Sequence, residues 1–192
     1  AFANVTADVM SAHGIKVYIF DCLRPTPELS FAVREMKCDA GVMVTASHNP
    51  KEYNGYKVYW DDGAQLPPLH AKQVADILNQ IDIFGDVKTI AKQEALDQGF
   101  ITVIGEEFDE KYMEKVLGES VGQQFVDKVD DEFRIIYSPI HGTGYRLVPE
   151  VLNRLGIKKL ITVPEQMMPE GHFPTTESPN PEDREALQLA IM

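Results

Sequence analysis

Hydrophobic positions along the chain switch repeatedly between a helical period and short continuous or alternating runs. Apolar residues three and four apart are typical of helices, whereas short stretches rich in β-branched and aromatic residues are typical of strands. The two patterns follow each other in turn from start to finish. This alternation predicts an α/β fold with mostly parallel strand pairing.

The first half of the chain is predicted to contain three helices and four short strands. The helices are expected at residues 5–13, 26–36 and 69–81, and the strands at 16–20, 40–44, 56–60 and 64–66. Thr26 is a candidate cap for the second helix. The pair Asn54-Gly55 is a strong turn signal. The run 40–44 is continuously apolar, which predicts a strand buried on both faces. Residues 84–104 show no clear pattern.

The second half repeats this alternation after an amphipathic helix at residues 106–117. Residues 118–131 form either a connector or a poorly packed helix. Strands are then expected at 133–137 and 159–163, and helices at 145–155 and from Asn180 onward. Loops are expected at 138–144 and 164–181. We therefore expect two Rossmann-like α/β/α units with mixed, mainly parallel sheets, both incomplete. The units are placed at residues 1–104 and 105–192.

Composition and charge exclude several classes of protein. The 192 residues are 44% hydrophobic, which suits a globular core, and no run approaches the ~18 apolar residues of a membrane span. The net charge of -12 argues against a nucleic-acid partner. Two cysteines, Cys22 and Cys38, show no metal-ligand spacing, so we expect reduced thiols in a cytoplasmic protein.

The two ends of the chain predict a piece of a longer polypeptide. The sequence has no initiator methionine and begins within a predicted helix. It stops at Met192 inside an apolar-periodic segment that carries no helix-stop signal. Incomplete sheets leave an unpaired strand edge, which favours association between copies, so a homodimer is one expected state.

A candidate nucleophile follows the strand at residues 40–44. Ser47 lies where ligands gather in open α/β sheets, outside the carboxyl end of a strand. His48 can hold or relay a proton, and Asn49 can fix the loop. Lys57, ten residues beyond Ser47, can place an ammonium group within reach of a phosphate on the serine. A plain turn with a solvent-facing histidine explains the same residues about equally well.

A longer run of residues favours the chemical interpretation. The string Gly41-Val42-Met43-Val44-Thr45-Ala46-Ser47-His48-Asn49-Pro50, followed by Tyr53-Asn54-Gly55-Tyr56-Lys57-Val58-Tyr59, closely resembles the α-D-phosphohexomutases, the family of phosphoglucomutase and phosphomannomutase. Residues 24–29, 138–144 and 178–182 are also similar to that family, the last two to its bacterial phosphoglucomutase branch. The resemblance covers most of the chain.

The resemblance implies a phosphoserine mechanism. Ser47 would carry a phosphoryl group, give it to a hexose monophosphate and take the other phosphoryl group back from the bisphosphate. Phosphate would thereby move between C1 and C6, with glucose 1-phosphate, glucose 6-phosphate and glucose 1,6-bisphosphate as partners. His48 and Lys57 would transfer protons and stabilise charge. Arg24, Asn49 and His141 are the candidates for binding substrate or phosphate.

Two of these candidates have structural alternatives. Arg24 can neutralise a substrate phosphate, but an arginine in a loop is more often solvated or held in a weak surface pair. His141 lies in a Gly-rich turn between a strand and a helix, where glycines can admit an anion. A purely structural turn is about equally expected there.

The resemblance also implies Mg²⁺, held by the phosphate of Ser47 and by an Asp-x-Asp-x-Asp-Arg loop. That loop is not in the sequence, and Asp61-Asp62 and Asp130-Asp131 have the wrong spacing and neighbours. The family's Gly-Glu-x-Ser-Gly sugar-recognition loop and its C-terminal phosphate-binding loop are not in it either. We therefore expect the 192 residues alone to bind Mg²⁺ weakly and to be inactive.

Other functions remain open at the level of sequence. Within the family, the chain is also compatible with phosphomannomutase or with a phosphopentose or amino-sugar mutase. A serine hydrolase using Ser47 and His48 is disfavoured, because the sequence has no Gly-x-Ser-x-Gly elbow and a neighbouring histidine rarely has the required geometry. A non-catalytic phosphosugar-binding module is the alternative from another class.

Overall fold

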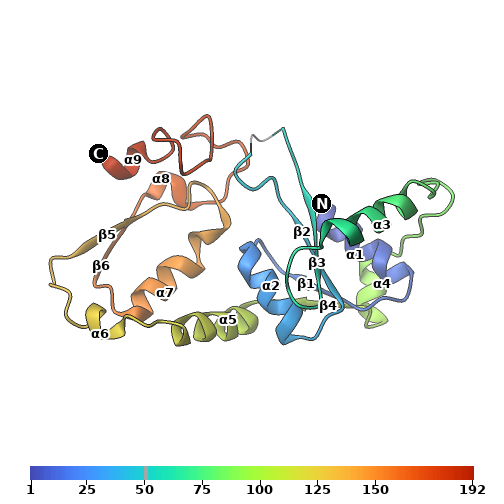
Figure 1. Cartoon of the computed structure of the whole chain (residues 1–192), viewed down its shortest axis with the longest axis horizontal. Coiled ribbons are helices and arrows are strands. Elements are labelled where there is room, and N and C mark those ends of the chain that lie inside the picture. Colours follow the sequence, from blue (N-terminus) through green and yellow to red (C-terminus); the bar gives the residue numbers. More distant parts are fainter. Residues whose placement is uncertain (50–51) are drawn as a thin grey trace. The chain divides into compact units, whose positions relative to one another are not determined.

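The computed structural model describes residues 1–49 and 52–192, and their contacts divide the chain into two compact units. The first comprises residues 1–45 and 55–105, and the second comprises residues 46–54 and 106–192. Figure 1 shows the elements of both units coloured along the sequence.

The first unit combines helices with two separate strand pairs. Its elements, in chain order, are α1 (Phe2–Ala12), β1 (Val17–Phe20), α2 (Thr26–Glu35), β2 (Ala40–Val44), β3 (Tyr56–Trp60), α3 (Pro68–Leu78), α4 (Lys92–Asp97) and β4 (Ile101–Ile104). Strands β1 and β4 pair in parallel, and β2 and β3 pair antiparallel.

A small apolar core joins helix α1 to the β1–β4 pair. Ala7 of α1, Ala95 of α4 and Ile101 of β4 are buried at its centre. The two alanines let the helices approach closely, because they carry no side chain beyond Cβ. Val17 and Ile19 of β1 pack against this cluster from the strand.

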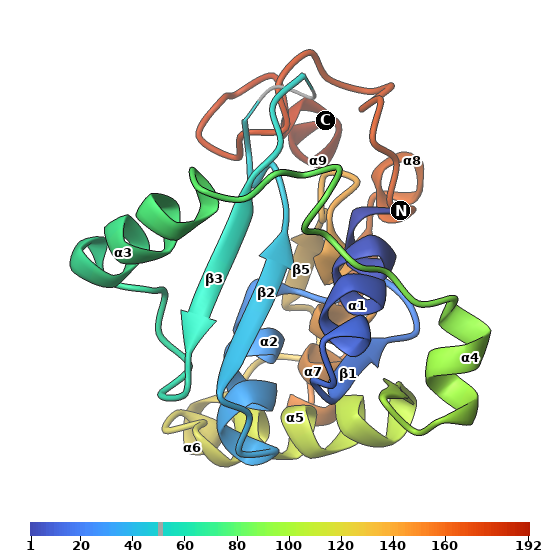
Figure 2. The same cartoon turned by 90° about the vertical axis from the view of Figure 1, so that its right-hand side faces the viewer.

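The β2–β3 hairpin lies against helix α2. Its register pairs Val44 with Tyr56 at the end where the strands are connected, and Figure 2 shows the two strands side by side and running in opposite directions. Gly41 of β2 is buried, and a Cβ on it would lie only 2.6 Å from Cγ2 of Val33 in α2. Helix and strand can therefore approach this closely only with glycine at position 41.

The second unit is built on a parallel βαβ arrangement. Its elements are α5 (Glu106–Gly118), α6 (Gln123–Val126), β5 (Arg134–Tyr137), the short 3₁₀ helix η1 (Thr143–Tyr145), α7 (Leu147–Leu155), β6 (Lys159–Thr162), α8 (Pro164–Met167) and α9 (Gln188–Ile191). Strands β5 and β6 are parallel neighbours, and α7 connects them through the crossover that parallel pairing requires.

Ion pairs fasten α7 to α5. The guanidinium of Arg154 donates two hydrogen bonds to the carboxylate of Glu110, at 2.7 and 2.8 Å. Arg146, just before α7, lies 3.2 Å from Glu106 and 3.6 Å from Asp109. Asp109 is buried, so loss of Arg146 should cost more stability than breaking a solvated surface pair.

The predicted α/β fold is confirmed, and two of the three strand pairs among the described residues are parallel. The strands at 40–44 and 56–60 form at those residues, and the turn back toward Leu66 pairs Tyr59 with Gln65. The mixed sheet expected in the second unit is a single parallel pair among the described residues. None of the described helices is both long and apolar enough to cross a membrane.

Several local predictions were wrong. Strand β2 is not buried on both faces, because β3 is its one partner in a two-stranded ladder and Ala40 is exposed. Thr26 is the first residue of α2 rather than its cap, a position taken by Pro25. No long helix begins near Asn180, since the described helix there is the short α9. The sequence pattern also missed α4, β4 and α8, which are only four to six residues long.

Candidate functional site

The serine loop, residues 46–54, is the connection between β2 and β3. It is closed at its base by two backbone hydrogen bonds, in which the N–H of Thr45 donates to the carbonyl of Gly55 and the N–H of Gly55 donates to the carbonyl of Thr45, each at 2.9 Å. Neither Asn54 nor Gly55 has a positive φ, so the predicted Asn-Gly turn does not form. Gly55 instead lies opposite Thr45 and extends the hairpin by one pair beyond Val44 and Tyr56.

Ser47 occupies a tight turn immediately beyond this base. The N–H of Asn49 donates to the carbonyl of Ala46 at 3.1 Å, which closes a four-residue turn with Ser47 and His48 at its centre. Ser47 has a φ of 57°, and His48 is not among the residues with positive φ. A positive φ strongly favours glycine, because residues with a Cβ rarely adopt it. A serine there is held in a conformation that costs roughly 1–2 kcal/mol.

The hydroxyl of Ser47 faces the ring of its neighbour. Its Oγ lies 3.3 Å from Nδ1 of His48, and both residues are exposed. A histidine at this distance can exchange a proton with the hydroxyl or with a group bound to it. His48 therefore reaches the hydroxyl of Ser47 even though the two residues are neighbours in the sequence. A hydrolase triad would also need a carboxylate hydrogen-bonded to His48, and none of the described residues supplies one.

Lys57 lies on β3, two residues after the base of the loop. It pairs with Met43 of β2 and is half-buried. Side chains alternate along a strand, so Lys57 shares a face with the buried Tyr59. Its stem is therefore anchored in the hairpin, which is the usual arrangement when a lysine keeps its ammonium group at the edge of an apolar surface.

Arg24 is buried rather than solvated. Its side chain is 2% exposed and lies 3.1 Å from the carboxylate of Asp21 and 3.9 Å from that of Glu28, which is itself fully buried. Its guanidinium also lies over the ring of Phe20. Burial by itself raises the pKa of Asp21, but the hydrogen bond with Cys22 and the charge of Arg24 outweigh it and leave that pKa below its usual value. These contacts favour a structural role for Arg24.

His141 is likewise enclosed by its own unit. It is 5% exposed, its Nδ1 lies 3.0 Å from the carbonyl of Met168, and its Nε2 lies 2.9 Å from Oγ1 of Thr175. A carbonyl oxygen only accepts, so Nδ1 must carry the proton. Both ring nitrogens thus have protein partners, which favours the structural alternative for His141 over phosphate binding.

Gln166, which the sequence analysis did not single out, is the centre of this polar network. It is fully buried, accepts a hydrogen bond from the hydroxyl of Ser138 at 2.6 Å, and donates to Thr175 and to the carbonyl of Ala186, each at 3.1 Å. The main-chain carbonyl of Gln166 also accepts a hydrogen bond from the backbone N–H of His141 at 2.8 Å. A lone glutamine between a strand and a Pro-rich loop gives no signal in the sequence that it will be buried.

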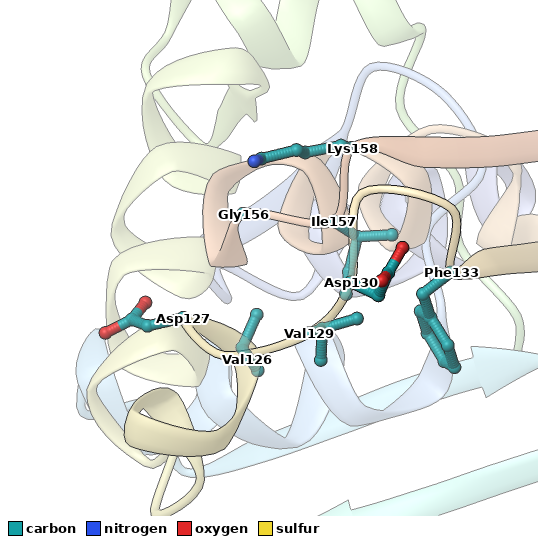
Figure 3. Close-up of a pocket in the computed structure, with 8 residues that line it drawn as sticks. All are labelled: Val126, Asp127, Val129, Asp130, Phe133, Gly156, Ile157 and Lys158. Atoms are coloured by element: carbon teal, nitrogen blue, oxygen red, sulfur yellow. The ribbon is translucent and has the colours of Figure 1, made fainter.

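A metal site is not seen among the described residues, and one surface hollow lies in the second unit. No group of three or more His, Cys, Asp or Glu among the described residues is placed to hold a metal ion. A depression of about 280 Å³ opens beside Phe133 and Lys158, where β5 and β6 begin (Figure 3). It therefore lies at the amino ends of these strands, whereas ligands of open α/β sheets bind at the carboxyl ends.

Comparison with known proteins gives the same family over both halves of the chain. Residues 1–83 match the profile of "Phosphoglucomutase/phosphomannomutase, alpha/beta/alpha domain I", and residues 110–192 match that of domain II. Phosphoglucomutases of Staphylococcus epidermidis and Staphylococcus aureus are 36% and 38% identical to the chain over 99% of its length. The chain spans only about a third of the length of these relatives (34% and 33%).

A solved structure shares the fold. A crystal structure from Thermus thermophilus, assigned as a phosphomannomutase, superimposes with a TM-score of 0.74 and covers 99% of this chain, which in turn covers 40% of that one. The two sequences are 23% identical, so this likeness shows the fold alone.

Proposed function

Because the chain belongs to the phosphoglucomutase/phosphomannomutase family, we propose that the whole protein is a phosphohexomutase that moves phosphate between C1 and C6 of a hexose. Phosphoglucomutases at 36–38% identity favour glucose phosphates as its substrates. Phosphomannomutase is the second candidate, since the family includes both activities. The observation that carries the proposal is the turn at Ser47, which presents a strained, exposed serine beside a histidine.

The proposed reaction uses Ser47 twice. In the first transfer a hydroxyl oxygen of the hexose monophosphate bonds to phosphorus and releases its proton, while the bond between phosphorus and Ser47 Oγ breaks and Oγ takes up a proton. In the second, Ser47 Oγ gives up that proton and attacks the other phosphate of the bisphosphate, whose bond to the sugar oxygen breaks as that oxygen takes up a proton. We assign proton transfer to His48, at 3.3 Å from Oγ, and stabilisation of charge on the phosphoryl oxygens to Lys57.

Asn49 has a supporting part in this proposal. Its N–H closes the turn that holds Ser47, and its exposed side chain is free to face a substrate phosphate. Arg24 and His141 were predicted to bind phosphate as well. Since their polar groups are committed to partners inside the protein, we propose instead that they stabilise the loops on which they lie.

Incubation of the whole protein with hexose phosphates tests the proposal. We expect conversion of glucose 1-phosphate to glucose 6-phosphate, with mannose 1-phosphate converted more slowly, and an intact mass about 80 Da above that of the unmodified chain, the mass a phosphoryl group adds. Preferential turnover of mannose 1-phosphate would support the phosphomannomutase alternative. Binding of hexose phosphates without turnover or added mass would support a non-catalytic phosphosugar-binding module.

The 192 residues expressed by themselves are expected not to catalyse this conversion. The acidic loop that would complete a Mg²⁺ site is not in their sequence, and the described residues hold no cluster of metal ligands. Mg²⁺ supplies charge neutralisation to phosphoryl transfer, and the phosphate of Ser47 is the one ligand we assign to this chain. Coupled assay of glucose 6-phosphate formation, with the whole protein as control, checks this expectation. Turnover at the rate of the whole protein would contradict it.

Domain boundaries, location and assembly complete the proposal. We propose a division between residues 104 and 105; the change of contacts after Gly105 supports it, although residues 46–54 group with the second unit. Free thiols at Cys22 and Cys38 suit a cytoplasmic protein. A homodimer is supported by Ile136 and Ile161, register partners in β5 and β6 that are both exposed.

A further inference from the structure

The base of the serine loop depends on the absence of a side chain at position 55. A Cβ on Gly55 would lie 2.6 Å from the carbonyl oxygen of Thr45, a distance that Cβ atoms do not adopt. Gly55 does not have a positive φ, so its conformational freedom is not what the position requires. The requirement is the close approach of two backbones, which lets Thr45 and Gly55 exchange two hydrogen bonds of 2.9 Å.

This closed base lies only two residues from the strained serine. A left-handed serine persists only where its surroundings fix the chain on both sides. The Thr45–Gly55 pair fixes the chain before Ser47, and the hydrogen bond from Asn49 to Ala46 fixes it after. If the base opened, the chain at Thr45 would be released and Ser47 could return to a negative φ. Its Oγ would then leave the position beside Nδ1 of His48.

We infer that Gly55 is a positioning residue for phosphoryl transfer, because its missing side chain keeps the loop base closed and thereby holds Ser47 in its left-handed turn. The kinetic part of this inference rests on the proposed function. Gly55 touches neither phosphate nor sugar in this role and acts only through Ser47. Displacement of a reacting group by about 1 Å can cost on the order of 100-fold in rate, so a small opening suffices.

The substitution Gly55→Ala in the whole protein tests the inference. We expect kcat and the rate at which glucose 1,6-bisphosphate phosphorylates Ser47 to fall by about 10- to 100-fold. Because Gly55 itself contacts neither phosphate nor sugar in this role, KM should change much less than kcat. Amide hydrogen exchange at Thr45 should accelerate by on the order of tenfold, while the amide of Val17, in the β1–β4 pair, stays protected. If Gly55 were needed only for the stability of the whole unit, hydrogen exchange at the amide of Val17 would accelerate as well.

Gly171→Ala is the matched control. A Cβ at Gly171 would meet no atom within 4 Å, and this glycine does not have a positive φ. Its substitution should leave kcat and exchange at Thr45 unchanged. A Gly55→Ala protein with the kcat and the Ser47 phosphorylation rate of the unmodified protein would overturn the inference.

A measurement on the unmodified protein covers the case in which Gly55→Ala fails to fold. In mild denaturant the amides of Thr45 and Asn49 should lose protection together, because opening the base releases the turn. Retained protection at Asn49 after Thr45 has exchanged would overturn the inference. If the unmodified protein carries no phosphoserine and has no mutase activity, the proposed function fails, and this exchange experiment still decides whether the closed Thr45–Gly55 base holds the turn at Ser47.

Discussion

Ser47→Ala is expected to abolish both the added phosphoryl mass and mutase turnover of the whole protein. Both transfers of the proposed reaction pass through Ser47 Oγ, so removing this one atom stops the cycle rather than slowing a single step. We expect a loss of activity on the order of 10⁴-fold or more, as for other enzymes deprived of their nucleophile. Intact-mass spectrometry and the hexose phosphate assay measure the two effects separately.

The fold should survive this substitution. Ser47 is exposed, and alanine is no better suited than serine to a φ of 57°. Ser47→Gly should be equally inactive but more stable by about 1 kcal/mol, because glycine adopts that φ without a steric penalty. Ser120→Ala, outside the serine loop, is the control for loss of a hydroxyl elsewhere. Retained turnover in Ser47→Ala would refute Ser47 as the phosphoryl carrier.

Gln166→Ala is expected to have the largest effect on stability. The change leaves a buried cavity and removes the side chain that joins Ser138, Thr175 and the carbonyl of Ala186. Each buried group left without a partner costs about 1–3 kcal/mol, and partial relaxation reduces the total. We expect the free energy of unfolding to fall by about 3 kcal/mol. Urea denaturation followed by circular dichroism provides the measurement.

Two further variants separate the causes of this loss. Gln124→Ala removes an exposed glutamine of the same unit and should change stability by less than about 0.5 kcal/mol. Gln166→Glu keeps the volume but replaces the amide donor with an oxygen that faces the carbonyl of Ala186. It should be destabilised at neutral pH and partly recover in acid, where the protonated carboxyl can donate. If Gln166→Ala were as stable as the unmodified protein, the hydrogen-bond network around Gln166 would not be what stabilises the segments that carry Ser138, Thr175 and Ala186.

Residue patterns predicted the hairpin and the phosphoserine motif, but not the way the loop is closed. The Asn54-Gly55 pair was expected to form a turn, since that dipeptide suits two consecutive residues of positive φ. Instead Gly55 lies opposite Thr45 in the ladder. Which partner a glycine must approach depends on strand register, and register is fixed by contacts between residues distant in the chain.

The candidate phosphate-binding residues show the same limit. Arg24 and His141 lie in loops of the right type, so the sequence pattern offers both as candidates for phosphate binding. Only the folded structure shows that Arg24 is buried between Asp21 and Glu28, and that both nitrogens of His141 are occupied. Burial is decided by which elements pack over a loop, and a local pattern does not contain that information.

The sequence by itself determined the α/β class and the family resemblance and pointed to Ser47 as the proposed phosphoryl carrier, because periodicity and a long ordered motif are local properties of the chain. The tertiary structure alone decided the conformation of Ser47, the close approach at Gly55 and the buried network around Gln166. These features arise where segments meet in space. Their energies depend on distances of a few tenths of an ångström between atoms that the sequence places far apart.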